Sequence, residues 1–253
     1  MLFQGSAAVV LPQTPRHFAD WIIAVKRSEI NAIMQKADDF IQSHGFYLPP
    51  FAYWTPDDWT KKGPEVSEIV ENNLGWDITD FGQGDFHRIG LFLFTIRNGN
   101  IQNWQTLKGK LYAEKIMIVE DGQVTPMHFH WKKMEDIINR GGGELLIQLY
   151  NATADEQLDE KTEVHVSVDG LQRTLEPGDT VRLVSGESIS LEPRCYHKFW
   201  GQGRVLIGEV SLVNDDQHDN RFYEPFGRFP EINEDVPPLY LLCNDYARYY
   251  KGK

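Results

Sequence analysis

The sequence predicts a mainly β protein, an antiparallel sandwich or barrel with a helical extension at its N-terminus. From about residue 85 onward, short apolar runs alternate with turn-forming dipeptides, and no helical pattern is interleaved. Apolar residues at helical spacing gather instead before that point. We therefore expect a helical extension over residues 25–84 and a β-barrel domain with a C-terminal tail over residues 85–253.

The first residues do not contribute to this prediction. Leu2-Phe3-Gln4-Gly5-Ser6 resembles the remnant of a viral-protease tag-cleavage site, so we interpret residues 1–24 as a vector-derived or disordered segment.

Three helices are expected in the extension. One has apolar residues at helical spacing and ends at Gly45, its periodic positions being Ile30, Ile33, Met34, Ala37, Phe40 and Ile41. Thr55-Pro56 provides a cap followed by proline at the first helical position, opening a short helix through Trp59. A third helix is expected over residues 65–73.

The β-rich part contains a series of short strands separated by turn residues. Asn98-Gly99, Asp121-Gly122 and Asp169-Gly170 each follow a β-rich run and are typical of tight turns. The expected strands cover residues 89–97, 115–120, 144–150, 163–168, 180–184, 188–191 and 205–212. The aromatic tail, Tyr246 to Tyr250, is expected to pack back on the barrel.

Composition limits the classes of function. The chain has 253 residues and a formal net charge of -12, which would repel phosphate backbones and argues against nucleic-acid binding. Its apolar stretches are too short to span a membrane, and no segment resembles a secretion signal. With only two cysteines, Cys195 and Cys243, a disulfide-stapled secreted scaffold is not indicated, so we expect a cytoplasmic protein.

One segment combines metal-binding residue types. On an extended strand, His128 and His130 point to the same side, and Glu135 follows closely enough for the chain to bend and return its carboxylate. Two imidazoles and a carboxylate suit Mn, Fe, Co, Ni or Zn. His197, in a later strand region, is the natural fourth ligand. We therefore expect one divalent metal ion per chain.

The spacing around these residues resembles the first motif of the cupin superfamily. Gly122, five residues, His128-x-His130, four residues, Glu135, six residues and Gly142 fit that motif at every position. The second motif fits less well, because Gly186, Pro193 and His197 are present but the glycine between Pro and His is missing. Gly201 also stands where that motif usually has asparagine. The resemblance implies a cupin jelly-roll barrel.

Four segments also resemble the bacterial D-lyxose isomerases, over about residue 25 to the end. They are Lys26-Arg-Ser-Glu-Ile-Asn, Leu48-Pro-Pro-Phe-Ala-x-Trp54-Thr-Pro, the metal segment His128-Phe-His-Trp-Lys-Lys-Met-Glu, and Gly208-Glu-Val-Ser-x-Val-Asn214-Asp-Asp. The resemblance implies a Mn²⁺ enzyme that interconverts D-lyxose with D-xylulose and also D-mannose with D-fructose. Cupins are often dimers, so we expect a homodimer.

Aldose–ketose isomerisation moves a proton between adjacent carbons through an enediol. A divalent metal can stabilise the negative charge that grows on the two oxygens, and a base must reach the moving proton. Glu209 is costly inside a β-rich run unless it faces a polar cavity, so it is the preferred base. Lys133 is the complementary acid, and Asp215 and Asp216 are expected to accept hydrogen bonds from the sugar.

Two alternatives stay open at this point: a cupin Fe(II) oxygenase, and a non-catalytic sugar-binding cupin. The remaining reactive side chains are given structural roles. We expect His165 and His218 to be exposed, Trp131 to pack in the core, and Cys195 to be a buried, inert thiol.

Overall fold

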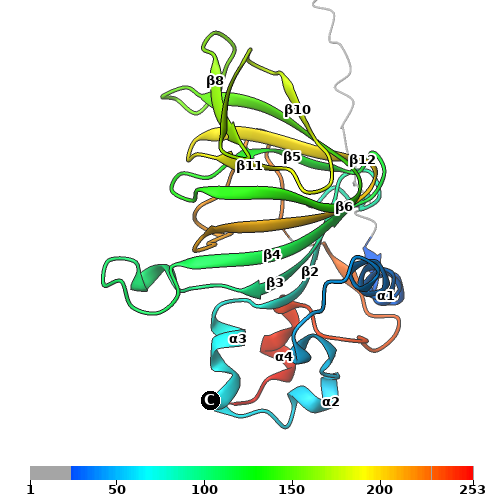
Figure 1. The fold of residues 1–253 in the computed structure, drawn as a ribbon. Coiled ribbons are helices and arrows are strands. Elements are labelled where there is room, and N and C mark those ends of the chain that lie inside the picture. The colour runs from blue at the N-terminus through cyan, green and yellow to red at the C-terminus, as the bar shows by residue number, and fades with distance from the viewer. Residues whose placement is uncertain (1–23, 229, 253) are drawn as a thin grey trace, which may run out of the picture.

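A computed structural model describes residues 24–228 and 230–252, so the predicted vector-derived segment lies almost wholly outside the described residues (Figure 1). The helices of the N-terminal part are α1 (Arg27–Ser43), α2 (Pro56–Trp59) and α3 (Ser67–Glu71), with 3-10 turns at Pro50–Tyr53 and Pro64–Val66. Gly45 follows α1 with a φ of 71°, and Thr55 accepts a hydrogen bond from the Asp58 backbone N–H at the start of α2. The first two predicted helices are confirmed; helical structure in the third region covers less than expected.

Antiparallel strands form the body of the molecule. The strands are β2 (Gly75–Thr79), β3 (Leu91–Arg97), β4 (Tyr112–Val119), β5 (Val124–Phe129), β6 (Glu135–Ala152), β7 (Leu158–Asp159), β8 (Val164–Val168), β9 (Leu171–Leu175), β10 (Thr180–Leu183), β11 (Ser188–Leu191), β12 (Cys195–Leu212) and β13 (Arg221–Phe222). Among the described residues they are hydrogen-bonded in the order β2-β3-β4-β12-β6-β11-β8-β9, with β5 beside β12 and β10 beside β6. The mainly β cupin barrel is thus confirmed.

Two long strands, β6 and β12, pair along most of their length and bend in the middle. The bend coincides with register shifts between Gln202 and Ile207 and with Gly142, whose φ is 91°. A Cβ on Gly142 would lie 2.3 Å from the Arg204 carbonyl oxygen, so only glycine fits this approach. The bend lets residues at both ends of β12 reach the same interior, which is where the site lies.

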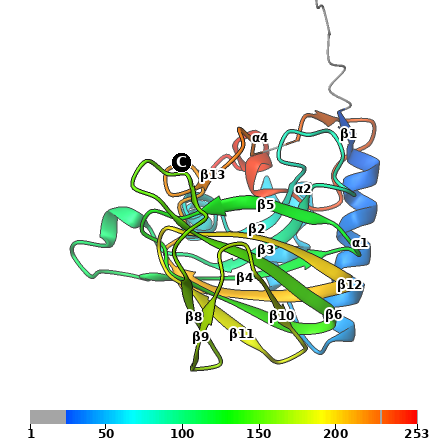
Figure 2. The same ribbon diagram turned by 90° about the horizontal axis from the view of Figure 1, so that it is seen from above.

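Strands β3 and β4 are covered on both faces, which explains why their residues read as continuous apolar runs. Side chains such as Leu93 and Met117 point into the barrel, whereas Phe94 and Ile118 point outward beneath α1. Figure 2 shows α1 along one side of the strands. Each fully buried aliphatic side chain of this layer contributes about 1.5–3 kcal/mol, so the helix and the barrel stabilise each other.

The C-terminal segment contains β14 (Ile232–Asn233), a 3-10 turn at Cys243–Asp245 and α4 (Tyr246–Tyr249), and β14 pairs with β1 (Val25–Lys26). Tyr246 packs against Trp59 with ring centroids 4.5 Å apart, and its hydroxyl donates to the Leu74 carbonyl at 2.5 Å. Figure 1 shows α2, α3 and α4 together beyond β2, β3 and β4. The expectation that this tail packs on the barrel is corrected, because it packs mainly on the helical extension.

Two other differences from the expected elements have simple causes. Strand β2 lies within the segment assigned to the helical extension; its apolar residues Trp76 and Ile78 alternate with Asp77 and Thr79, but the strand is only five residues long and all of it is buried. The turn at Asn98-Gly99 does not join two strands directly, because residues 98–111 form a longer connection with a 3-10 turn at Ile101–Asn103. In contrast, Asp169-Gly170 joins β8 to β9 as expected, both residues having positive φ.

In the described part of the chain, no helix has the length and apolar composition needed to cross a membrane. Both cysteines are free thiols, Cys195 being buried. Burial raises the pKa of Cys195 to about 12, which agrees with the inert role expected for it.

Candidate active site

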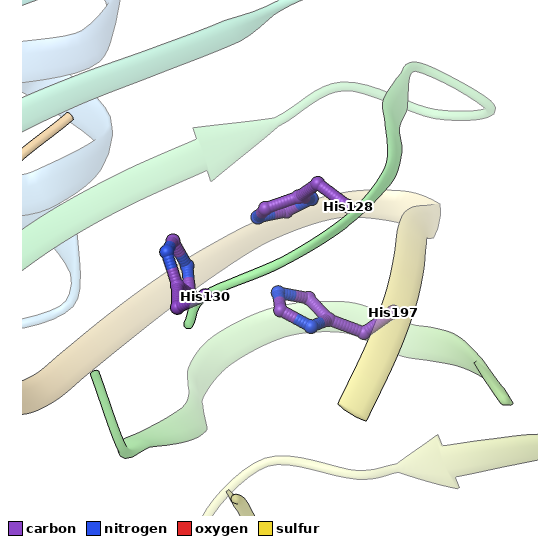
Figure 3. A group of neighbouring side chains, drawn as sticks. All are labelled: His128, His130 and His197. Atoms are coloured by element: carbon purple, nitrogen blue, oxygen red, sulfur yellow. The ribbon is translucent and has the colours of Figure 1, made fainter. Parts of the chain in front are cut away.

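Three histidines from two strand regions meet inside the barrel. His128 lies near the end of β5, His130 directly follows that strand, and His197 lies on β12 opposite His128. Their nearest ring nitrogens all lie within 4.8 Å of one another, and Figure 3 shows the three rings turned toward a common point. All three side chains are buried. The structure therefore brings together the histidines that the sequence predicted as ligands.

Backbone carbonyls set the orientation of each ring. The Nδ1 atoms of His128, His130 and His197 lie 2.8, 2.6 and 3.0 Å from the carbonyl oxygens of Pro126, Asp219 and Cys195. Because a carbonyl only accepts, each Nδ1 carries the proton, which leaves the Nε2 lone pair free to bind a cation. Burial lowers the pKa of His128 well below its usual value, and the neighbouring His197 and His130 add to this.

Glu135, the first residue of β6, completes the group. Its Oε1 lies 3.0 Å from His197 Nε2 and 3.5 Å from His130 Nε2, but forms no hydrogen bond of acceptable geometry. Its Oε2 lies 2.7 Å from Lys133 Nζ. A buried carboxylate oxygen left without a donor, facing imidazole nitrogens that carry lone pairs, is the arrangement expected around a cation. The four residues therefore fit one divalent metal.

A chain of buried charges leads away from Glu135. Lys133 Nζ also donates to Glu209 Oε1 at 2.9 Å, so this lysine bridges the two glutamates. On the other side of Glu209, Lys115 Nζ lies 3.3 Å from Oε1 and donates to Oε2 at 3.4 Å. Ser211 donates to Glu209 Oε1 at 3.0 Å. The two residues expected to move protons thus lie side by side.

These groups hold each other in their charged forms. Burial alone would raise the pKa of Glu209, but Lys115 and Lys133 outweigh it and the pKa is lowered. Burial likewise opposes the charge on Lys133, yet Glu135 and Glu209 raise its pKa. The pKa of Glu135 lies well below its usual value because the Lys133 ammonium group overcomes the effect of burial. The site therefore contains ionised carboxylates at neutral pH.

The two aspartates predicted to bind substrate are placed differently. Asp216 lines the same cavity as the histidines and lies 3.3 Å from Arg228 and 3.9 Å from Lys115. Burial would raise its pKa, but Lys115 and Arg228 lower it far below the usual range. Asp215 instead lines an adjacent outer hollow, where it contacts the exposed His218 at 3.0 Å. Only Asp216 shares the cavity of the histidines.

The cavity has a polar end and an apolar wall. Besides the metal-site residues and the charged groups, it is lined by Thr79, Thr125 and Asn220 and by the apolar side chains Phe81, Leu91, Leu93, Met117, Ile137, Phe199 and Phe222. Carbon–hydrogen faces of a small ligand can pack on this wall while its polar groups meet the charged end.

Sequence reasoning missed three residues of the site. Lys115 stands in the run Lys-Ile-Met-Ile-Val, where a buried lysine could have been noticed as costly. Arg228 forms an ion pair with Asp77 in addition to Asp216. The carboxylate of Asp219 accepts the backbone N–H groups of Lys132 and Lys133, each at 2.9 Å, and no local pattern could have indicated this.

The side chains given structural roles behave mostly as expected. His165 and His218 are exposed. Trp131 differs, because it is only half-buried and donates its indole N–H to Glu156 at 2.8 Å. It lies outside the cavity lining, so it shapes the loop rather than the core.

Known proteins are similar to this chain in sequence and in fold. Residues 25–246 match the family model described as D-lyxose isomerase. A D-lyxose/D-mannose isomerase of Serratia proteamaculans is 49% identical over 89% of this chain and 99% of its own length. The protein of the same name from Escherichia coli O157:H7 is 47% identical over 89% of this chain and all of its own.

Solved structures agree at the level of fold. An L-ribose isomerase mutant of Acinetobacter sp. DL28 in complex with L-ribose has a TM-score of 0.56 at 14% identity, covering 83% of this chain and 99% of that one. The L-ribose isomerase of Cellulomonas parahominis with L-ribose has a TM-score of 0.54 at 15% identity, with the same coverage. At these identities the likeness concerns the cupin fold.

Proposed function

Because this chain belongs to the D-lyxose isomerase family and is therefore a sugar isomerase, we propose that it interconverts D-lyxose with D-xylulose and D-mannose with D-fructose. The two aldoses share their configuration from C2 to C4, so one site can accept both. The observation that carries the proposal is the chain of contacts from Glu135 through Lys133 to Glu209, beside three converging histidines.

In this proposal, His128, His130, Glu135 and His197 hold one divalent ion, Mn²⁺ being preferred over Co²⁺, Ni²⁺, Fe²⁺ or Zn²⁺. The bound ion would supply Lewis-acid stabilisation of the negative charge that develops on the sugar's oxygens. The donor set supports this role, since the backbone carbonyls engage Nδ1 of each ring and Glu135 Oε1 has no hydrogen-bond partner among the described residues.

Glu209 is the proposed base. Its ionised carboxylate takes the proton from C2 of the open-chain aldose and returns it to C1, while the hydroxyl proton passes from O2 to O1. Lys133 lies between Glu135 and Glu209, and its ammonium group has three hydrogen-bond donors. It is the proposed acid that assists the transfer of the hydroxyl proton from O2 to O1. The net reaction is a rearrangement and needs no oxidant or reductant.

Asp216 would accept hydrogen bonds from sugar hydroxyls, supported by its place in the cavity beside Arg228 and Lys115. Asp215 lines the outer hollow, and its hydrogen bond with the sugar, made as the sugar enters, remains a prediction. A homodimer and a cytoplasmic location also stay predictions. Family membership favours isomerisation over the oxygenase and over non-catalytic sugar binding.

The proposal is tested by incubating the metal-loaded protein with a panel of aldoses and measuring ketose formation. We expect turnover of D-lyxose and D-mannose, loss of activity with EDTA, and recovery on adding Mn²⁺. Inactivity on both sugars would contradict the substrate assignment. Oxygen uptake in the presence of sugar would indicate the oxygenase instead.

Glu209→Gln tests the role of the base. Because a positioned base contributes about 10²–10⁴-fold, we expect kcat to fall by about a thousandfold while the sugar still binds. Glu144→Gln is the matched control, since Glu144 is a β6 glutamate whose partner, Arg182, is exposed. Retained turnover in Glu209→Gln would remove Glu209 from the mechanism.

A further inference from the structure

Two polar side chains of the cavity have buried oxygen atoms that the fold leaves without a hydrogen-bond partner. They are Thr125 Oγ1 and Asn220 Oδ1, and both residues line the cavity that contains the three histidines. Thr125 is only 2% exposed. Folded proteins seldom leave such atoms unpaired unless a water or a ligand meets them. Neither atom has a role in the proton transfer described above.

A β-bulge turns Thr125 into the cavity. Regular alternation would place residues 125 and 128 on opposite faces of β5. However, His197 pairs with His128 and Phe199 pairs with Thr125. The two paired positions are three residues apart on β5 but only two residues apart on β12. The extra residue falls at Pro126-Met127, and proline, which has no N–H, suits a break in the ladder. The bulge therefore presents Thr125 on the same face as His128.

Asn220 approaches from the neighbouring segment. The next two residues form β13, in which Phe222 pairs with His128. The preceding residue, Asp219, accepts the Nδ1–H of His130 through its carbonyl at 2.6 Å. Asn220 is therefore held between two residues that contact the ligand histidines, and its side chain is free to face a ligand.

We propose that Thr125 and Asn220 bind hydroxyl groups of the open-chain sugar other than those at C1 and C2, and so position the substrate and select it. This inference rests on the proposed function. A threonine hydroxyl both donates and accepts, and a carboxamide oxygen accepts a sugar O–H. Glu209 and Lys133 are the proposed proton-transfer groups at C1 and C2. Thr125 and Asn220 are therefore positioning residues that bind the rest of the sugar chain.

The test removes the polar atom while keeping the shape, in Thr125→Val and Asn220→Leu. Losing one hydrogen bond should reduce kcat/KM for D-lyxose by about tenfold. The same variants are assayed on D-lyxose analogues lacking one hydroxyl, at C3, C4 or C5. On the analogue that lacks the partner hydroxyl, variant and wild type should be equal. Thr125→Ser, which keeps the hydroxyl, should restore most of the activity, and Thr174→Val on the exposed strand β9 is the control.

Binding of D-arabinitol, the alditol formed by reducing D-lyxose, gives a readout that does not depend on turnover. Calorimetry should show weaker binding to both variants, with unchanged metal content. Equal losses on the complete and the deoxy sugars, or unchanged alditol affinity, would overturn the inference. A further outcome is that the wild type forms no ketose while both variants still bind the alditol more weakly than the wild type does. That result would contradict the proposed function but support the role of Thr125 and Asn220 in binding sugar hydroxyls.

Discussion

At the scale of single residues, the site depends on a buried lysine that the sequence did not identify as important. Lys115 Nζ donates to Asn214 Oδ1 at 2.6 Å and lies within 3.4 Å of both oxygens of Glu209. A buried carboxylate needs such a partner to stay ionised. Lys115 therefore sets the charge state of the proposed base, although it need not touch the sugar.

Lys115→Met should change the pH dependence of the reaction. Without the ammonium group, the lowered pKa of Glu209 rises. The base works in its ionised form, so activity falls as pH drops through this pKa, and the acid limb of the kcat profile should move to higher pH. Lys115→Arg, which keeps the charge, should leave the limb near its wild-type position. An unmoved limb in Lys115→Met would contradict this role.

Most of the proposed metal ligands could be named from the sequence because their spacing is local, whereas their supporting contacts are not. His128, His130 and Glu135 lie within eight consecutive positions, and strand alternation links the first two. Lys115 and Thr125 lacked such a pattern, since one is paired across strands and the other is turned by a bulge. Strand β2 was missed because it has only five residues, a window too short to separate its alternation of Trp76 and Ile78 with Asp77 and Thr79 from a loop.

At the scale of elements, the connection from β5 to β6 contains His130 and Lys133, two residues of the proposed mechanism, and is held by a distant loop. Asp219 accepts two backbone N–H groups of this connection through its carboxylate and the His130 ring through its carbonyl. One residue thus fixes His130, a proposed metal ligand, and the segment that carries Lys133. Such contacts behind the ligands usually matter for metal affinity.

Asp219→Asn should weaken metal binding by about ten- to a hundredfold. The amide has one oxygen where the carboxylate has two, so one of the N–H groups of Lys132 and Lys133 would face an NH₂ group. Competition with a chromophoric chelator measures the affinity without an activity assay. Asp155→Asn, in an exposed turn, is the control. Unchanged affinity would show that the connection is rigid without Asp219.

At the scale of the whole molecule, the start of the helical extension is fastened to the end of the chain. Arg27, the first residue of α1, is fully buried and donates to Asp245 at 2.9 and 3.0 Å and to Glu234 at 2.8 Å. Strand β1 pairs with β14 beside it. This ionic cluster therefore adds to the apolar layer beneath α1, which Leu242 of the C-terminal segment also joins.

Arg27→Met should destabilise the fold by about 3–5 kcal/mol, because it leaves the buried carboxylate of Asp245 without its partner. Urea unfolding measures the change. Restoring neutrality with the double variant Arg27→Met, Asp245→Asn should recover part of the loss, since the uncompensated charge is its main cause. Arg182→Met, which breaks an exposed pair with Glu144, should leave the midpoint nearly unchanged. Equal midpoints for Arg27→Met and Arg182→Met would show that the ion pairs of Arg27 contribute no more to stability than an exposed ion pair does.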